Sequence, residues 1–214
     1  MKNFVVLDLD GTLLDTLKGI TRAVNRGLSY YNYPDQYDEE TIKGFIGNGA
    51  RKLFLRAIKK DKFDDETDLQ YDKFCEFYEE EQYVSKPYEG VVETLKELNK
   101  RDVKIIIYSN KPDWLLKNVV AATLKDIDIL CVQGQVDDYP VKPDVTLLNK
   151  ILKEHNLNHY YGLYIGDSLT DNQTALNAQM DFVFCEYGYS KPDDCAKVLG
   201  SNISKFSEIL NFLK

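Results

Sequence analysis

Five short apolar runs, separated by segments with helical periodicity, constrain the fold of this chain more than any other feature. The runs cover residues 3–7, 103–108, 127–132, 161–165 and 182–185, and they are rich in Val, Ile, Tyr and Phe. Nearly continuous apolar character is typical of strands buried on both faces of a parallel sheet. The sequence therefore predicts an α/β fold with a doubly wound, Rossmann-like parallel sheet.

Apolar stripes at the spacing of an amphipathic helix begin near Val91, Leu115 and Leu147, between the predicted strands. One segment breaks this alternation, because residues 15–83 contain no convincing strand and predict helices near 17–28, 50–60 and 68–83. We expect this insertion to form a helical cap domain over residues 15–83, and residues 1–14 and 84–214 to form the α/β core. Ligands of open α/β sheets bind outside the carboxyl ends of the strands, and the cap leaves the core at that end.

The overall charge and composition argue against several classes of protein. The chain has 214 residues, 43% of them hydrophobic, which is enough for one core with a small inserted domain. Its net charge of −8 argues against a nucleic-acid partner, because nucleic-acid binding depends on neutralising phosphates with Lys and Arg.

No apolar run approaches the roughly 20 residues that cross a bilayer, so we expect no membrane partner. Acids interrupt the N-terminal apolar segment where a signal peptide would continue, and the cysteines form no CxxC pair. These features predict a cytoplasmic protein with reduced thiols.

The segment DLDGT, residues 8–12, directly follows the first apolar run. Asp8 and Asp10 are two residues apart, so both carboxylates can point to one side of the strand end if Leu9 turns away. Gly11 permits a sharp turn, and Thr12 adds a hydroxyl group. Solvated loop acids are the alternative, but this pattern after a buried strand favours part of an active site.

A second acidic segment, GDSLTDN at residues 166–172, follows the fourth apolar run. Asp167 lies at the predicted strand end, and Asp171 lies four residues later. Together with Asp8 and Asp10 they form a set of four acids that would repel one another strongly without a cation. A hard divalent metal with oxygen ligands, Mg²⁺ above all, resolves this repulsion. An acid facing the positive end of a helix dipole remains the alternative for Asp171.

Polar residues also follow the second apolar run and precede a later helix. Ser109 lies at the predicted strand end beside Asn110, where hydroxyl and backbone N–H groups can hold phosphate oxygens or cap the next helix. Lys142 precedes Pro143, which favours an extended conformation of its neighbour. A solvated lysine is the alternative, but the acids need a cation nearby, so we place Lys142 in the site.

The four segments in this order resemble the haloacid dehalogenase superfamily: Asp-x-Asp-Gly-Thr, a strand ending in Ser, Lys-Pro, and Gly-Asp-x-x-x-Asp. The helical insertion after the first segment resembles the small cap domain of that superfamily. Within it, GFIGNGARKLFLRA at residues 44–57 is similar to the cap loop of phosphoglycolate phosphatases and their near relatives. PYEGVVETLKEL at residues 87–98 is also similar to that group.

The resemblance implies a Mg²⁺-dependent phosphate monoester hydrolase for a small phosphorylated metabolite of the phosphoglycolate type. Asp8 would be the nucleophile that forms an aspartyl-phosphate, and Asp10 would protonate the leaving alcohol and then activate water. The metal would be held by the Asp8 carboxylate, the Asp10 carbonyl and Asp167. Asp171 would bind the metal through water or orient its ligands.

The same resemblance assigns the remaining core residues to the phosphoryl group. Lys142 would pair with Asp8 and with the phosphate. The phosphoryl group itself would be bound by residues of the two strand-end loops, which are Gly11, Thr12, Ser109 and Asn110.

The cap is expected to select the substrate and to exclude water. Gly47 and Gly49 around Asn48 predict a mobile or tightly turned loop, and Arg51 is a candidate for a substrate carboxylate or second polar group. A surface position on the helix is an equal alternative for Arg51. The sequence leaves a monomer and a homodimer open, with an interface possible at the cap tyrosines Tyr30, Tyr31, Tyr33 and Tyr37.

Several other functions remain as alternatives. A phosphosugar mutase or pyrophosphatase of the same superfamily uses the same residues. Dehalogenases share the fold and the attacking Asp, but they need no second acid and no metal, so Asp10, Asp167 and Asp171 argue against them. A non-catalytic phosphometabolite sensor or a receiver-type signalling domain would share the acids and Mg²⁺ without sustained phosphate release.

Overall fold

The computed structural model describes residues 1–213, except for the side chains of Pro192 and Cys195. Its main sheet has six strands in the order β5-β4-β1-β6-β7-β8, and every neighbouring pair is parallel. The strands are β1 Phe4–Leu7, β4 Lys104–Pro112, β5 Cys131–Gln135, β6 Gly162–Gly166, β7 Asp181–Cys185 and β8 Ser201–Ile203. This arrangement confirms the doubly wound parallel sheet expected from the apolar runs.

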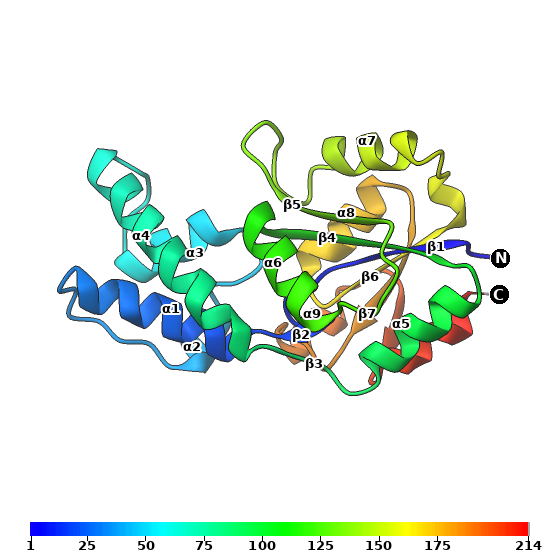
Figure 1. The fold of residues 1–214 in the computed structure, drawn as a ribbon, viewed down its shortest axis with the longest axis horizontal. Helices are drawn as coiled ribbons and strands as arrows, with labels where there is room; N and C mark the ends of the chain where they lie inside the picture. The colour runs from blue at the N-terminus through cyan, green and yellow to red at the C-terminus, as the bar shows by residue number, and fades with distance from the viewer. Residues whose placement is uncertain (214) are drawn as a thin grey trace.

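Helices cover both faces of the sheet, as Figure 1 shows. Alternate residues of β1 point to opposite faces, so Val5 packs in one apolar cluster with Leu95 and Phe206, and Val6 packs in another with Leu148. The core helices are α5 Val91–Lys100, α6 Asp113–Thr123, α7 Thr146–Glu154, α8 Leu169–Asn177 and α9 Pro192–Cys195, with 3₁₀ segments η1 Gln82–Val84, η2 His159–Tyr161 and η3 Phe206–Phe212.

The third predicted strand is displaced in the structure. We expected it at residues 127–132, but β5 begins at Cys131 and ends at Gln135. Ile127 packs into the core from the preceding loop, which explains its apolar character. The strand then continues through polar residues because β5 is an edge strand and is only partly buried. The short edge strand β8 was not expected at all.

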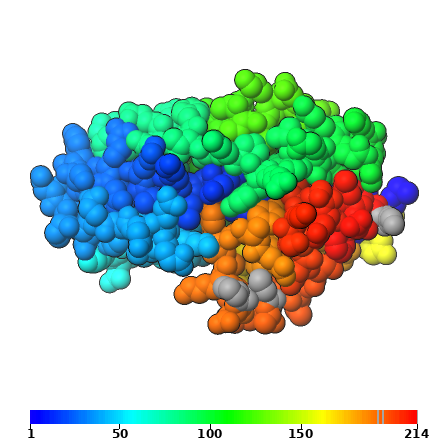
Figure 2. Space-filling model, turned by 90° about the horizontal axis from the view of Figure 1, so that it is seen from below, coloured from blue at the N-terminus to red at the C-terminus, as the bar shows by residue number. Residues whose placement is uncertain are grey.

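The residues between β1 and β4 contain a group of four helices at one end of the molecule (Figure 1). These helices are α1 Leu17–Tyr30, α2 Glu39–Lys43, α3 Ala50–Ile58 and α4 Asp65–Glu81. They enclose an apolar cluster of their own, in which Phe54 and Phe74 stack with ring centroids 5.3 Å apart. Figure 2 shows this part, in blue and cyan, packed against the core. We call these four helices the cap, and the domain boundaries given above stay a prediction.

Both chain crossings between cap and core run through one small antiparallel sheet. It pairs β2 Leu14–Asp15 with β3 Lys86–Pro87. These two-residue strands have no counterpart in the apolar pattern of the sequence.

Candidate active site

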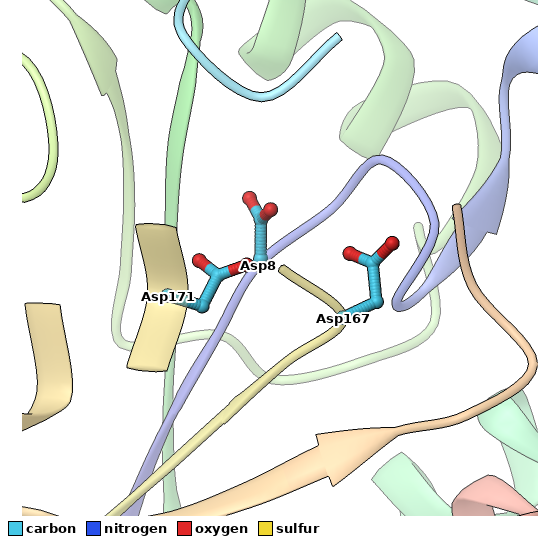
Figure 3. Close-up of side chains that lie close together, drawn as sticks. All are labelled: Asp8, Asp167 and Asp171. Atoms are coloured by element: carbon cyan, nitrogen blue, oxygen red, sulfur yellow. The ribbon is translucent and has the colours of Figure 1, made fainter. Parts of the chain in front are cut away.

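The carboxyl ends of the three central strands bring distant residues together. Leu7 of β1 pairs with Ile107 of β4 and Ile165 of β6, so the residues that follow these strands emerge at one edge. Asp8, Asp167 and Asp171 each offer an oxygen there within 4.8 Å of the others, as Figure 3 shows. Three of the four acids expected to converge therefore lie together, and Asp10 lines the cavity beside them.

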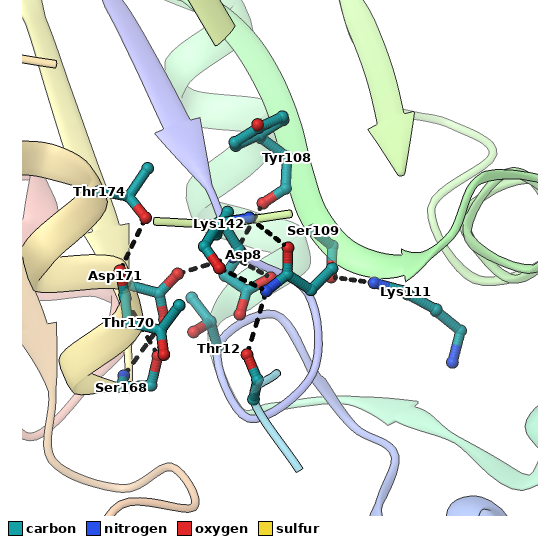
Figure 4. Close-up of polar contacts among 12 residues, drawn as sticks. Asp8, Thr12, Tyr108, Ser109, Lys111, Lys142, Ser168, Thr170, Asp171 and Thr174 are labelled. Atoms are coloured by element: carbon teal, nitrogen blue, oxygen red, sulfur yellow. Dashed lines mark hydrogen bonds and ion pairs between the residues drawn. The ribbon is translucent and has the colours of Figure 1, made fainter. Parts of the chain in front are cut away.

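Lys142 lies between two of these acids (Figure 4). Its Nζ is 3.1 Å from Asp8 Oδ1 and 2.7 Å from Asp171 Oδ1, and its side chain is 2% exposed. Burial opposes the charge on Lys142, but the carboxylates of Asp171 and Asp8 outweigh it and raise the pKa of Lys142 above its usual range. Lys142 is therefore a permanent cation beside Asp8.

Asp171 has both of its oxygens in hydrogen bonds. Oδ1 accepts from Lys142 and from the Tyr164 hydroxyl at 3.3 Å, and Oδ2 accepts from the Ser168 hydroxyl at 2.5 Å and the Ser168 N–H at 3.2 Å. Ser168 and Asp171 form a capping box at the start of α8. Asp171 is therefore an acid at a helix N-terminus, which was the alternative given for it from the sequence, and it also orients Lys142.

Asp167 is held by two donors from other loops. Its Oδ1 accepts from the Thr12 hydroxyl at 3.0 Å, and its Oδ2 accepts from the Tyr189 N–H at 2.6 Å. Burial, and then the charges of Asp171 and Asp8, raise the pKa of Asp167 well above its usual range. A cation would offset that cost of burying the charged form.

The loop after β1 is shaped by contacts of Gly11 and Thr12. Thr12 is fully buried and donates to Asp167, so it positions a carboxylate instead of facing the phosphate cavity. Gly11 has φ +81°, and a Cβ on it would come within 2.3 Å of Asp167 Oδ2. The Gly11 N–H donates to the Leu14 carbonyl and the Thr12 N–H to the Leu9 carbonyl. These contacts give Gly11 and Thr12 roles in shaping the loop, and their binding of a phosphoryl group stays a prediction.

Ser109 and Asn110 at the end of β4 have separate roles. Ser109 lines the cavity beside Asp8. The Asn110 amide accepts from the Lys142 N–H at 2.8 Å and donates to the carbonyls of Lys142, at 3.3 Å, and of Gly47 in the cap, at 3.1 Å. Its side chain therefore connects the cap loop to Lys142, and its binding of phosphate stays a prediction.

A cavity of about 550 Å³ lies between cap and core, and it contains the acids. Core residues on its wall include Asp8, Asp10 and Ser109, and cap residues include Gly49 and Tyr78. Within residues 1–213, neither Asp8 Oδ1 nor Asp10 Oδ1 accepts a hydrogen bond, although Lys142 forms an ion pair with Asp8. Buried acceptors of this kind are available to a ligand or a metal ion.

Two of the three cap residues expected at the substrate lie elsewhere. The Arg51 guanidinium pairs with Asp68 at 2.5 Å and lies 3.7 Å from the Phe63 ring centroid. The Asn48 side chain accepts a hydrogen bond from Arg56 at 2.7 Å. Gly49 does line the cavity, so the cap loop reaches the site through its backbone, and the surface alternative applies to Arg51.

Sequence reasoning missed Tyr78 and Tyr189, and it gave Lys111 no role. Lys111 lies 3.6 Å from Asp10 Oδ1 and donates to the Tyr78 hydroxyl at 2.5 Å. Burial lowers the pKa of Lys111, and Asp10 opposes this effect. The Tyr189 hydroxyl accepts from the Thr16 N–H at 2.6 Å. The sequence could have indicated a site role for Lys111, because it directly follows Ser109 and Asn110. Tyr78 and Tyr189 can be identified only from contacts between distant segments.

The environment of Asp8 predicts how the stability of the metal-free protein depends on pH. Burial and then the charge of Asp171 raise the pKa of Asp8 from 3.8 to about 7, against the effect of Lys142. Between these values the folded state holds a proton that the unfolded state has lost, so this contribution to stability falls as pH rises. Relative to wild type, Asp8→Asn is expected to gain about 2–3 kcal/mol of unfolding free energy between pH 5 and 7.

Urea unfolding of both proteins in EDTA at several pH values measures this difference. A gap between wild type and Asp8→Asn that stays constant from pH 5 to 7 would contradict the assigned environment of Asp8.

Comparisons with a family model and with known proteins agree on the family of this chain. The family model described as "Haloacid dehalogenase-like hydrolase" matches residues 5–185. Phosphoglycolate phosphatase 1 of Pseudomonas aeruginosa is 31% identical over 201 residues, which cover 89% of this chain and 71% of that protein. The phosphoglycolate phosphatase of Vibrio cholerae is 31% identical over 205 residues, which cover 90% of this chain and 88% of that protein.

A solved structure agrees with these relatives. The crystal structure of a "predicted phosphoglycolate phosphatase" from Haemophilus somnus matches with a TM-score of 0.89 and 26% identity. The match covers 100% of this chain and 98% of that one. Among the described residues, no helix is both long enough and apolar enough to span a membrane.

Proposed function

Because the chain belongs to the haloacid dehalogenase-like hydrolase family and is a phosphatase, we propose that it hydrolyses the phosphate monoester of a small metabolite, of the phosphoglycolate type, through an aspartyl-phosphate on Asp8. The observation that carries this proposal is the Asp8 carboxylate. It is buried at the end of β1 and faces the cavity between cap and core, and Oδ1 accepts no hydrogen bond from residues 1–213. A carboxylate held in this way is available to attack phosphorus.

In the first step an oxygen of Asp8 forms a bond to phosphorus while the bond from phosphorus to the leaving oxygen breaks. The proton needed by the leaving alcohol comes from Asp10, which lines the same cavity two residues further along the chain. In the second step Asp10 takes a proton from water as the water oxygen attacks phosphorus. Asp8 leaves as a carboxylate, and inorganic phosphate is released.

Lys142 and Ser109 support the transferring phosphoryl group. The Lys142 ammonium, 3.1 Å from Asp8, offsets the negative charge that the carboxylate and the phosphate bring together. Ser109 offers a hydroxyl at the cavity wall. Lys142 is fixed before the substrate binds, its ammonium by Asp171 and its backbone N–H by Asn110, which is the arrangement that stabilises developing charge most effectively.

The residues at this edge of the sheet fit a bound Mg²⁺. Three carboxylates offer oxygens within 4.8 Å of one another, and they are hard ligands of the kind this ion prefers. The Asp8 and Asp167 carboxylates and the Asp10 carbonyl would hold it, while Asp171 is occupied by Lys142 and Ser168. When bound, the ion would offset the negative charge of the reacting phosphate. Thr12 and Tyr189 keep Asp167 oriented for that role.

The substrate assignment is tested by steady-state phosphate release from a panel of phosphorylated compounds with Mg²⁺. The panel contains phosphoglycolate, sugar phosphates, nucleoside monophosphates and pyrophosphate. We expect the largest kcat/KM for a small alkyl phosphate such as phosphoglycolate, because the similar proteins of Pseudomonas aeruginosa and Vibrio cholerae are phosphoglycolate phosphatases. Preference for pyrophosphate, isomerisation of a sugar phosphate without release, or binding without turnover would each replace this proposal with one of its alternatives.

A further inference from the structure

Lys111 is a buried cation to which the reaction described above gives no role. It follows Asn110 at the end of β4, and its side chain is 0% exposed. An ammonium group removed from water is costly unless it is paired and hydrogen-bonded, so its partners identify its role. Figure 4 shows the Lys111 side chain directed away from the Asp8–Lys142 pair.

The partners of Lys111 come from both sides of the cavity. On the core side, Nζ lies 3.6 Å from Asp10 Oδ1, an oxygen that accepts no hydrogen bond from the described part of the chain. On the cap side, Nζ donates to the Tyr78 hydroxyl at 2.5 Å and lies 3.9 Å from the centroid of that ring. Tyr78 belongs to α4 and is 3% exposed. The three side chains thus form one row from the cap to Asp10.

We propose that Lys111, held by Tyr78 of the cap, is a positioning residue that orients Asp10 for proton transfer to the leaving oxygen. This inference rests on the proposed function, in which Asp10 supplies that proton. It makes the acid step depend on a docked cap, because α4 provides the hydroxyl that fixes the ammonium.

The charge balance of the first step favours this role. As the bond from Asp8 to phosphorus forms and the bond to the leaving oxygen breaks, the Asp10 proton moves to the leaving oxygen. Asp10 is then a carboxylate on the wall of the cavity between cap and core, 3.6 Å from the Lys111 ammonium. The attraction between them grows during that step, and Lys111 keeps all of its protons throughout.

The test compares two substrates that differ in their need for the Asp10 proton. The leaving group of an alkyl phosphate is a strongly basic alkoxide unless it is protonated as it departs. The leaving group of dinitrophenyl phosphate is a stable phenolate, which needs no proton. We expect Tyr78→Phe to lower kcat/KM for the alkyl phosphate by about 10- to 100-fold, and for dinitrophenyl phosphate by less than about threefold. The ratio kcat/KM is used because it covers the steps up to release of the alcohol.

Three further variants distinguish positioning from packing. Tyr71→Phe is the matched control, since Tyr71 lies on the same helix in the same apolar cluster without belonging to the row, and it should leave both ratios unchanged. Lys111→Met removes the ammonium and should reproduce the selective loss of Tyr78→Phe. The double variant should lose no more than Lys111→Met alone, because both act through one contact.

The inference is overturned if Tyr78→Phe keeps full activity on both substrates, or if it loses equally on both. Should Lys111→Met fail to fold, the result for Tyr78→Phe still decides, because that change removes only one hydroxyl group. If wild type is active and Asp8→Asn is inactive, either of these outcomes refutes the role of Lys111 but leaves the proposed function standing. A wild type without turnover of either substrate refutes the proposed function.

Discussion

Replacement of Asp8 by asparagine is expected to abolish phosphate release, with a loss of about 10⁴-fold or more. The amide has the shape of the carboxylate but cannot attack phosphorus, and no other described acid combines the position at the end of β1 with the ion pair to Lys142. Steady-state phosphate release with the best substrate of the panel measures the effect. Circular dichroism should show an unchanged fold, since the side-chain volume is nearly the same.

The matched control is Asp102→Asn, in a turn whose carboxylate is 87% exposed and pairs with Lys104 at the surface. It should retain full activity. Rapid quenching of wild type during turnover should further reveal a phosphoryl group on Asp8 by mass spectrometry. Sustained turnover by Asp8→Asn would refute the covalent mechanism, whatever the substrate.

Chelation of divalent metal is expected to have the second largest effect, a loss of activity below detection that added Mg²⁺ reverses. Asp8 must attack a phosphate that is itself an anion, and the neighbouring Asp167 adds further negative charge. Without a cation this repulsion is offset by Lys142 and Lys111 alone among the described residues that contact Asp8 or Asp10. The measurement is phosphate release in EDTA, with EDTA saturated by Mg²⁺ as the control.

A binding readout accompanies the activity measurement. Mg²⁺ at about 100 times its dissociation constant should stabilise the folded protein by about 2.7 kcal/mol, seen as a rise in the melting temperature. Asp167→Asn should reduce this rise, because it removes one charged ligand. The asparagine oxygen can keep only one of the two hydrogen bonds that Thr12 and Tyr189 donate to Asp167. Turnover that persists in excess chelator would contradict the metal assignment.

Much of the fold and of the site follows from local sequence. Continuous apolar runs identify four of the central strands closely, because a strand buried on both faces tolerates little else. The parallel arrangement then brings Asp8, Ser109 and Asp167 to one edge without any knowledge of side-chain contacts. Lys142 was placed in the site because four acids require a cation, and the structure shows its ion pair with Asp8.

Other features depend on contacts that local sequence does not contain. Thr12, Asn110 and Arg51 are polar residues that suit a phosphate or a substrate, yet each is taken by a protein partner from a distant segment. The link from Tyr78 to Lys111 spans 33 positions and crosses from cap to core. The start of β5 was missed because an edge strand needs fewer apolar residues, which weakens its pattern.

The pairing of β2 with β3 affects how this enzyme architecture can vary. Leu14 lies opposite Pro87 and Asp15 opposite Lys86, so the whole insertion enters and leaves the core through adjacent backbone positions. The cap therefore joins its two flanking core segments at adjacent positions, as the turn of a β-hairpin joins two strands. Helices can lengthen or shorten beyond this paired segment while the strand ends that carry Asp8, Ser109 and Asp167 keep their register. The contact from Tyr78 to Lys111 is what such changes in the cap must preserve.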